Sequence, residues 1–147
     1  MGLIFKIGSR LLINSMKKDE VKEYLTPDGT YSLEKDLKYL NDGDPRHTFN
    51  IYRYLGKNKK KGLLFHIHGG SWIYGDKMFA DPYYVSLVKQ GYDLISISYR
   101  LIPSVTIDDE IKDCYQALKY ILNNQDLNLD TSKVLLIGDS AGGHLAM

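Results

Sequence analysis

The chain of 147 residues has the size and composition of one folded domain. Apolar residues make up 44% and charged residues 25% of it, an ordinary balance that excludes an intrinsically disordered chain. The net charge of +1 gives no strong electrostatic field, so we expect neither nucleic acid nor a membrane as a partner.

A single cysteine, Cys114, means that the chain forms no intrachain disulfide. Structural disulfides belong mainly to oxidising compartments, and a lone cysteine is compatible with a reducing one. We therefore predict a cytoplasmic location.

The N-terminal stretch GLIFKIGSRLLI is apolar but is interrupted by Lys6 and Arg10. It is too short to span a bilayer. It predicts an amphipathic helix that packs on the domain, an interpretation favoured over attachment to a membrane surface. A polar lead-in with turns near residues 27–29 and 43–45 follows. We divide the chain into this helix and lead-in, residues 1–43, and a domain over residues 44–147.

Four segments of the domain have the patterns of strands. Residues 49–55 are rich in aromatic and β-branched side chains. Residues 63–68, 93–99 and 134–138 are short apolar runs, typical of strands buried on both faces. We expect the last three to be parallel neighbours, with residues 134–138 between the other two or beside them.

Two helices are predicted between these strands. One begins with Asp81 as N-cap and Pro82 at the first helical position, and it stops at Gly91. Thr106 is the expected cap of the next. Its predicted apolar face consists of Ile107, Ile111, Cys114, Leu118 and Ile121. Strands that alternate with helices predict an α/β fold, a mostly parallel sheet with helices on both faces.

The sequence GDSAG, residues 138–142, matches the motif G-x-S-x-G and is here named the nucleophile turn. It lies between a predicted strand and the start of a helix, as the motif requires. The sharp turn strains the serine backbone and exposes its hydroxyl, and side chains at the two flanking positions would collide. This predicts Ser140 as a nucleophile; the alternative is a tight turn in which Ser140 is only an N-cap. We expect Asp139 to be exposed and outside the catalytic machinery.

A second motif, HGGSW over residues 68–72, follows an earlier strand and is here named the glycine loop. Acyl transfer needs backbone N–H donors for the oxyanion, and one comes from the residue after the nucleophile, Ala141. Gly70 is the favoured second donor, with Gly69 and Ser71 as neighbours that could donate instead. Trp72 is either a wall of the substrate pocket or a packing residue.

Together these motifs resemble the α/β-hydrolase superfamily, within the branch of hormone-sensitive-lipase-like, feruloyl-esterase-like and kynurenine-formamidase-like enzymes. The matching segments, in the family's order, are GDPRHTFNIYRYL, FHIHGGSWIYGDK, QGYDLISISYRLIP, IKDCYQALKYI and LLIGDSAGGHLA. The run HGGSW is closer to the H-G-G-x-W form of the formamidases than to the H-G-G-G form of lipases. The resemblance implies that Ser140 is the nucleophile and that Gly70, or a neighbour, and Ala141 form the oxyanion hole. It further implies a small ester or amide substrate and no metal or organic cofactor.

The chain departs from this family in one respect. The family's acid and histidine follow later strands, after the serine. His144 is the only histidine beyond Ser140, and it lies about one turn along the same helix, a poor position for a base. We therefore expect a truncated α/β-hydrolase fold, the N-terminal half of the domain, with the acid and base outside this chain. The alternative is a catalytically inert fragment or remnant.

Three further features allow a functional and a structural interpretation. His66 and His68 have the spacing of metal ligands, but without a third ligand we favour a role of His68 in shaping the glycine loop. The lysine-rich run over residues 57–61 is interpreted as a solvated loop rather than a polyanion site. Arg100 is expected to pair with Asp113 in a structural role.

Overall fold

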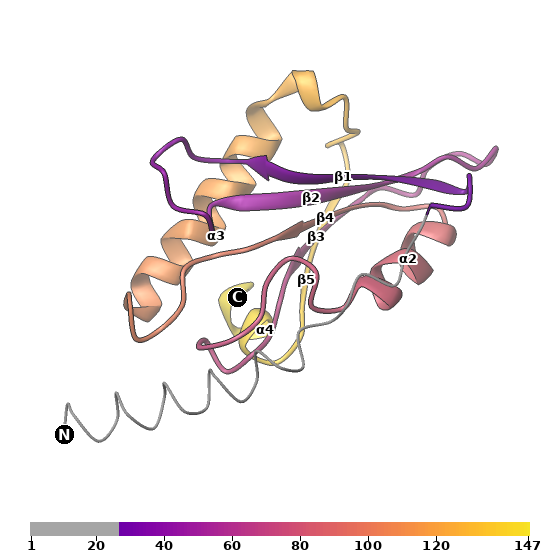
Figure 1. Cartoon of the computed structure of the whole chain (residues 1–147). Coiled ribbons are helices and arrows are strands. Elements are labelled where there is room, and N and C mark those ends of the chain that lie inside the picture. Colours follow the sequence, from indigo (N-terminus) through magenta and orange to yellow (C-terminus); the bar gives the residue numbers. More distant parts are fainter. Residues whose placement is uncertain (1–26) are drawn as a thin grey trace.

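A computed structural model describes residues 27–147, which form one sheet with helices on both faces (Figure 1). The predicted N-terminal helix lies outside these residues. The strands are β1 (Tyr31–Lys38), β2 (Thr48–Tyr54), β3 (Leu63–Ile67), β4 (Asp93–Ile97) and β5 (Val134–Gly138). The helices are α2 (Asp81–Lys89), α3 (Ile107–Asn123), the 3₁₀ turn η2 (Gln125–Leu127) and α4 (Ala141–Leu145). Among them, no helix is long and apolar enough to cross a bilayer.

The strand order is β1-β2-β4-β3-β5. β3 pairs in parallel with both β4 and β5, which confirms the three predicted parallel neighbours and places β5 beside the other two. β2 is antiparallel to β1 and to β4, so four of the five strands share one direction. The sheet is therefore mixed, with a parallel half that ends in the nucleophile turn.

β1 is a strand that the sequence analysis did not predict, because it lies in the stretch interpreted as a polar lead-in. Half of its eight residues are charged, three of them in succession from Glu34 to Asp36, and exposed and partly covered positions alternate from Glu34 to Lys38. Its pairing with β2 shifts register between Glu34 and Leu37, where Asp36 has a positive φ of 57°. This irregularity breaks the two-residue period that would have revealed the strand.

The core divides into two clusters, one on each face of the sheet. α2 packs on one face, where Tyr84 and Val88 meet Leu64 and Leu94. α3 and α4 cover the other face, over the cluster of Phe49, Phe65, Ile67, Ile95, Cys114, Ala117 and Leu145. β3 and β4 are buried along their whole length, as their apolar sequences predicted.

The helix ends follow the predicted signals with one correction. α3 begins after Thr106, whose hydroxyl accepts from the Asp109 amide while the Asp109 carboxylate accepts from the Thr106 amide, a complete capping box. α2 begins one residue earlier than predicted, because Ala80 and not Asp81 is its N-cap. Asp81 is instead buried in the first turn and accepts a hydrogen bond from the Tyr52 hydroxyl. That buried acceptor role explains why Asp81 does not cap the helix.

The buried face of α3 is turned relative to the predicted apolar stripe. Ile107 and Ile111 are 37% and 43% exposed, whereas Glu110 and Asp113 face inward. Asp113 accepts a bidentate pair of hydrogen bonds from Arg100 at 2.8 and 2.7 Å, which confirms the predicted pair. The prediction was thus wrong for Ile107 and Ile111, where the inward carboxylates hold the loop after β4, whereas Cys114, Leu118 and Ile121 pack on the core as predicted.

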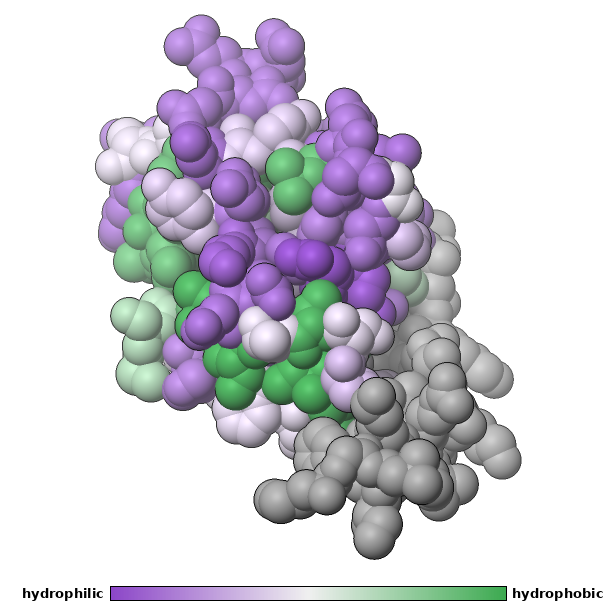
Figure 2. Space-filling view, turned by 90° about the vertical axis from the view of Figure 1, so that its left-hand side faces the viewer, coloured by the Kyte–Doolittle hydropathy of each residue, from purple (hydrophilic) through white to green (hydrophobic). Residues whose placement is uncertain are grey.

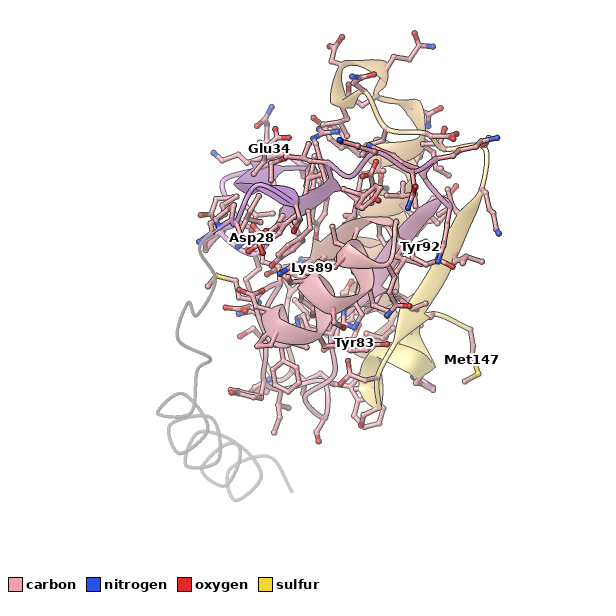
Figure 3. All side chains as sticks on the ribbon, turned by 90° about the vertical axis from the view of Figure 1, so that its right-hand side faces the viewer. Asp28, Glu34, Tyr83, Lys89, Tyr92 and Met147 are labelled. Carbon is pink, nitrogen blue, oxygen red and sulfur yellow. The ribbon has the colours of Figure 1, made fainter. Side chains whose placement is uncertain are left out.

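β5 has a neighbour on one side only within the described sheet (Figure 3, yellow). Its residues Leu135 and Leu136 are 39% and 44% exposed, in contrast to the fully buried β3. An apolar strand with a free edge presents unpaired N–H and C=O groups together with apolar side chains. This edge is the least covered part of the sheet.

We predict that Glu110 makes the stability of this fold depend on pH. The side chain is buried, its Oε1 atom accepts the Ile102 N–H, and Oε2 has no hydrogen-bond partner among residues 27–147. Burial is the main cause that raises the pKa of Glu110 to about 7. A folded-state pKa above the unfolded value means that the contribution is present at low pH and is lost as pH rises through about 4.5 to 7.

Glu110→Gln keeps the acceptor for Ile102 but cannot ionise. The variant should therefore gain, relative to wild type, on the order of 2 kcal/mol in free energy of unfolding between pH 5 and pH 8. Urea unfolding across this range measures it, with the exposed Glu34→Gln as control. Equal pH dependence of wild type and Glu110→Gln would show that Glu110 is ionised in the folded state at all these pH values.

Candidate active site

Ser140 lies in the turn between β5 and α4 with φ 50° and ψ −118°, a conformation disfavoured for any residue but glycine. This agrees with the predicted strain. Ser140 occupies the N-cap position of α4, yet its hydroxyl makes no capping hydrogen bond, and the residue is exposed. The bond that an N-cap serine would make is therefore missing, and the hydroxyl is free to meet a substrate.

Glycines on either side of Ser140 let α4 approach the sheet. A Cβ atom at Gly142 would lie 2.0 Å from the carbonyl oxygen of Ile67, at the end of β3. One at Gly138 would lie 2.5 Å from the carbonyl carbon of Gly142. Both distances are shorter than any real contact, so the predicted reason for these glycines holds in the structure.

We predict that Gly142→Ala destabilises the fold by about 1–3 kcal/mol, the usual cost of overpacking, because α4 must move away from β3. Gly143→Ala is the matched control in the same helix, since its added Cβ atom would come no closer than 3.2 Å to the Gly138 carbonyl oxygen. Thermal or urea unfolding compares them. Equal stability of the two variants would contradict the close packing of α4 on β3.

The glycine loop holds three successive residues with positive φ: Gly70 at 120°, Ser71 at 52° and Trp72 at 63°. The Gly70 carbonyl accepts the N–H groups of Ile73 and Tyr74 and closes the turn. Within residues 27–147 the N–H groups of Gly70 and Ser71 have no hydrogen-bond partner. The surrounding structure maintains this strained backbone. The N–H groups of Gly70 and Ser71 can therefore donate to a bound ligand.

The other predicted oxyanion donors differ in availability. Ala141 is the first residue of α4, so its N–H has no acceptor inside the helix. The N–H of Gly69, in contrast, donates to the Oδ1 atom of Asp139 at 3.2 Å. The candidates for an oxyanion hole therefore narrow to Gly70, Ser71 and Ala141.

His68 is a buried support of the glycine loop. Its ring stacks on that of Tyr99 with centroids 4.3 Å apart, and the Tyr99 hydroxyl donates to the His68 carbonyl at 2.7 Å. Burial lowers the pKa of His68 to about 3, so the ring is neutral and its Nδ1–H donates to the Gly69 carbonyl at 2.7 Å. Among the described residues, no group of three or more His, Cys, Asp or Glu side chains could hold a metal ion.

Arg46 is a second support that sequence reasoning missed. Its Nε atom donates to the carbonyl of Tyr99, just beyond β4, at 2.7 Å, and its Nη2 atom donates to the carbonyl of Gly75, just beyond the glycine loop. The guanidinium thus joins the two segments that follow β3 and β4. In the sequence Arg46 directly follows the predicted turn of residues 43–45, and nothing there indicates its distant acceptors.

Trp72 packs between two neighbouring segments. Its carbonyl accepts the Ile102 N–H at 2.9 Å. Its ring lies edge to face with the His144 ring, with the two centroids 5.6 Å apart. His144 is exposed, and no hydrogen bond joins its ring to Ser140 in the part of the chain that the structure describes. These contacts show Trp72 packed between two segments, and its part in a substrate pocket stays a prediction.

A cavity of about 550 Å³ lies between the segments after β3 and β4. Its lining residues are Asp44, Pro45, Arg46, Ile73, Arg100, Leu101, Ile102, Pro103, Ser104 and Val105. Figure 2 shows the face of the molecule that lies at the left of Figure 1. Apolar side chains gather in the lower half of this face. Six of the ten residues that line the cavity are apolar, and the other four, Asp44, Arg46, Arg100 and Ser104, are polar or charged.

The four histidines of the chain all lie in the described residues, and each is engaged away from Ser140. His47 contacts Asp42 and Asp113, and His66 contacts Tyr84 and Asp139, while His68 and His144 have the partners given above. None is hydrogen-bonded to the Ser140 hydroxyl. The described residues thus contain the nucleophile turn and candidate oxyanion donors, but no histidine hydrogen-bonded to Ser140.

A mixed sheet with a serine in a strained strand-to-helix turn, beside a glycine loop, defines an α/β hydrolase. Residues 49–147 match the BD-FAE family, and the chain belongs to that family.

The proteins to which this chain is similar include esterases and a deacetylase. The chain is 32% identical over 141 residues to an arylesterase of Saccharolobus solfataricus, a match covering 93% of this chain and 42% of that protein. It is 36% identical over 114 residues to bovine (Bos taurus) arylacetamide deacetylase, covering 67% of this chain and 28% of that protein. The crystal structure of esterase B from Lactobacillus rhamnosis superposes with a TM-score of 0.80 at 30% identity, over 99% of this chain and 48% of that one. The chain thus spans less than half the length of these relatives.

Proposed function

We propose that these residues supply the nucleophile and the oxyanion hole of a serine hydrolase that cleaves carboxylic esters or small amides. The observation that carries this proposal is the strained, exposed Ser140, in a turn that contacts the glycine loop, together with N–H groups of Gly70 and Ser71 that have no hydrogen-bond partner within residues 27–147. The names of the relatives, an arylesterase, an arylacetamide deacetylase and an esterase, support ester or amide substrates. As part of the proposal we keep a cytoplasmic site of action, which rests on the single cysteine.

In this mechanism the Ser140 hydroxyl oxygen attacks the carbonyl carbon of the substrate and loses its proton to a base. The Ala141 N–H, together with that of Gly70 or Ser71, stabilises the negative oxygen of the tetrahedral intermediate. Collapse of this intermediate releases the alcohol or amine, which takes up the proton, and leaves an acyl group on Ser140. Water then hydrolyses the acyl-enzyme by the same route. The chemistry requires no metal or organic cofactor.

The base and its acid partner belong, in this proposal, to a part of the hydrolase that these 147 residues do not contain. The absence of a histidine in contact with Ser140 among residues 27–147 supports this. The lengths of the relatives support it too, because the chain covers 42% of the arylesterase and 48% of esterase B. A second candidate, a catalytically inert fragment, is favoured by the same missing base and by the uncovered edge of β5.

We predict that the 147-residue chain alone shows no Ser140-dependent hydrolysis of a short-chain p-nitrophenyl ester. Loss of the histidine of a serine triad costs on the order of 10⁶ in turnover. The same residues, joined to the remaining part of a hydrolase domain, should cleave the ester and should lose this activity on Ser140→Ala. Esterase B is a suitable donor of that part, because its structure matches nearly the whole chain.

Release of p-nitrophenol by the short chain, the extended chain and the extended Ser140→Ala variant provides the comparison. Comparable rates in the short and extended chains, both abolished by Ser140→Ala, would mean that a base lies within these residues, with His144 the first suspect. An inactive extended chain that is folded would favour the inert fragment.

We also predict that the chain alone associates through β5. Leu136→Lys should lower its tendency to aggregate, because a charge on an exposed edge strand opposes pairing with another chain. Leu122→Lys on α3 is the matched control, since both leucines are 44% exposed. Static light scattering at equal concentration measures the difference. The same reduction in both variants would assign aggregation to general apolar exposure and not to the strand edge.

A further inference from the structure

We propose that Asp139 is a positioning residue that fastens the glycine loop to the nucleophile turn, and that the buried pair of His66 and Tyr84 holds its carboxylate in place. This inference rests on the proposed function of Ser140, because it concerns the loop that would supply the oxyanion donors. Neither the motif G-x-S-x-G nor the resemblance assigns a role to Asp139.

The fastening contact is one hydrogen bond between segments 70 residues apart in the sequence. The Gly69 N–H donates to the Asp139 Oδ1 atom at 3.2 Å. Asp139 directly precedes Ser140, and Gly69 directly precedes Gly70. The bond therefore joins the residue before the nucleophile to the residue before the favoured oxyanion donor.

The two segments also touch along their backbones. A Cβ atom at Gly69 would lie 2.4 Å from the Asp139 Oδ2 atom and 2.7 Å from the Asp139 carbonyl oxygen. Any side chain at residue 69 would push the Asp139 carboxylate away. The glycine at this position thus serves the contact with Asp139 and not the oxyanion directly.

His66 and Tyr84 support the carboxylate from the α2 side of the sheet. The Nε2 atom of His66 lies 3.4 Å from Asp139 Oδ1, and its Nδ1 atom lies 3.0 Å from the Tyr84 hydroxyl. Burial lowers the pKa of His66 to about 4, while Asp139 opposes this shift, so the ring is neutral near pH 7. A neutral ring donates from one nitrogen only. Because a carboxylate can only accept, the ring proton lies on Nε2, which faces Asp139 Oδ1 at 3.4 Å, and Nδ1 accepts from the Tyr84 hydroxyl.

The carboxylate is buried on one side and open on the other. The Asp139 side chain is 50% exposed, at a cavity of about 280 Å³ that His66, Tyr83 and Ile137 also line. In Figure 3, Tyr83 on α2 lies near the end of β5 that leads into the nucleophile turn. The Asp139 carboxylate is thus held from within the protein and exposed on its outer side, whereas Gly69 is buried. Exchange of the Gly69 amide proton reports on whether this amide keeps its acceptor.

The first experiment measures hydrogen exchange of the Gly69 amide by NMR in the 147-residue chain that carries Leu136→Lys, the change expected to lower its association through β5. Asp139→Ala should accelerate exchange by about tenfold or more, since the amide loses its acceptor. Asp139→Asn should keep most of the protection, because an amide oxygen also accepts a hydrogen bond. Asp126→Ala, a change of an exposed carboxylate in η2, should leave it unchanged. Unchanged exchange in Asp139→Ala would overturn the proposal.

The titration of His66 separates a positioning role from local unfolding. Asp139 raises the pKa of His66, so its removal should lower that pKa further below about 4. Local unfolding would instead expose the ring and move the pKa up toward 6.5, its ordinary value. An upward shift in both Asp139→Ala and Asp139→Asn would therefore contradict the assigned contact.

The functional experiment uses the extended chain described above. Asp139→Ala should lower kcat by roughly 10- to 100-fold with KM within about twofold, because oxyanion donors act mainly in the transition state. Asp139→Asn should restore part of kcat. Ser140-dependent activity that is equal in wild type and Asp139→Ala would refute positioning. An extended chain without Ser140-dependent activity would refute the proposed function alone, since exchange at Gly69 still tests the contact.

Discussion

The candidate site depends on one constraint, the contact between the backbone of α4 and the end of β3. Gly142 permits it, because any side chain there would occupy the position of the Ile67 carbonyl oxygen. This contact fixes the distance between the nucleophile turn and the glycine loop. Ser140 reaches its strained conformation because β5 is paired with β3 on one side while α4 must turn back over the same strand. The strain at Ser140 is thus a result of topology.

A second set of interactions, made by Tyr99 and Arg46, holds the backbone of the glycine loop and of the segment after it. Tyr99 donates to the carbonyl of His68 and stacks on its ring, and Arg46 joins the carbonyl of Tyr99 to that of Gly75. All of these acceptors are backbone carbonyls, which cannot be read from a pattern of side chains. These hydrogen bonds add to the apolar packing of Trp72 and Tyr99 on the core, and they orient the loop because hydrogen bonds are directional.

Much of this arrangement was predictable from the sequence, and the parts that were not have a common cause. Buried parallel strands and glycine-flanked turns leave strong local signals, so the parallel half of the sheet and the strained conformation of Ser140 were expected. β1 was missed because charges and a register shift hide its alternation. The inward carboxylates of α3 and the contacts of Asp139 were missed because they depend on partners that are distant in sequence. A carboxylate looks the same in a sequence whether water or a backbone amide is its partner.

The position of β3 at the centre of the parallel half has a consequence for how the chain folds. Leu63 pairs with Asp93 on one side and with Val134 on the other, so the central strand is made before either of its neighbours. Pairings between residues far apart in sequence form slowly, because a long loop must first be closed. During synthesis β3 can therefore pair with β4 once that strand has been made, but its other side stays unpaired until β5 follows. The rate at which β5 joins β3 sets how long the central strand lacks this second neighbour.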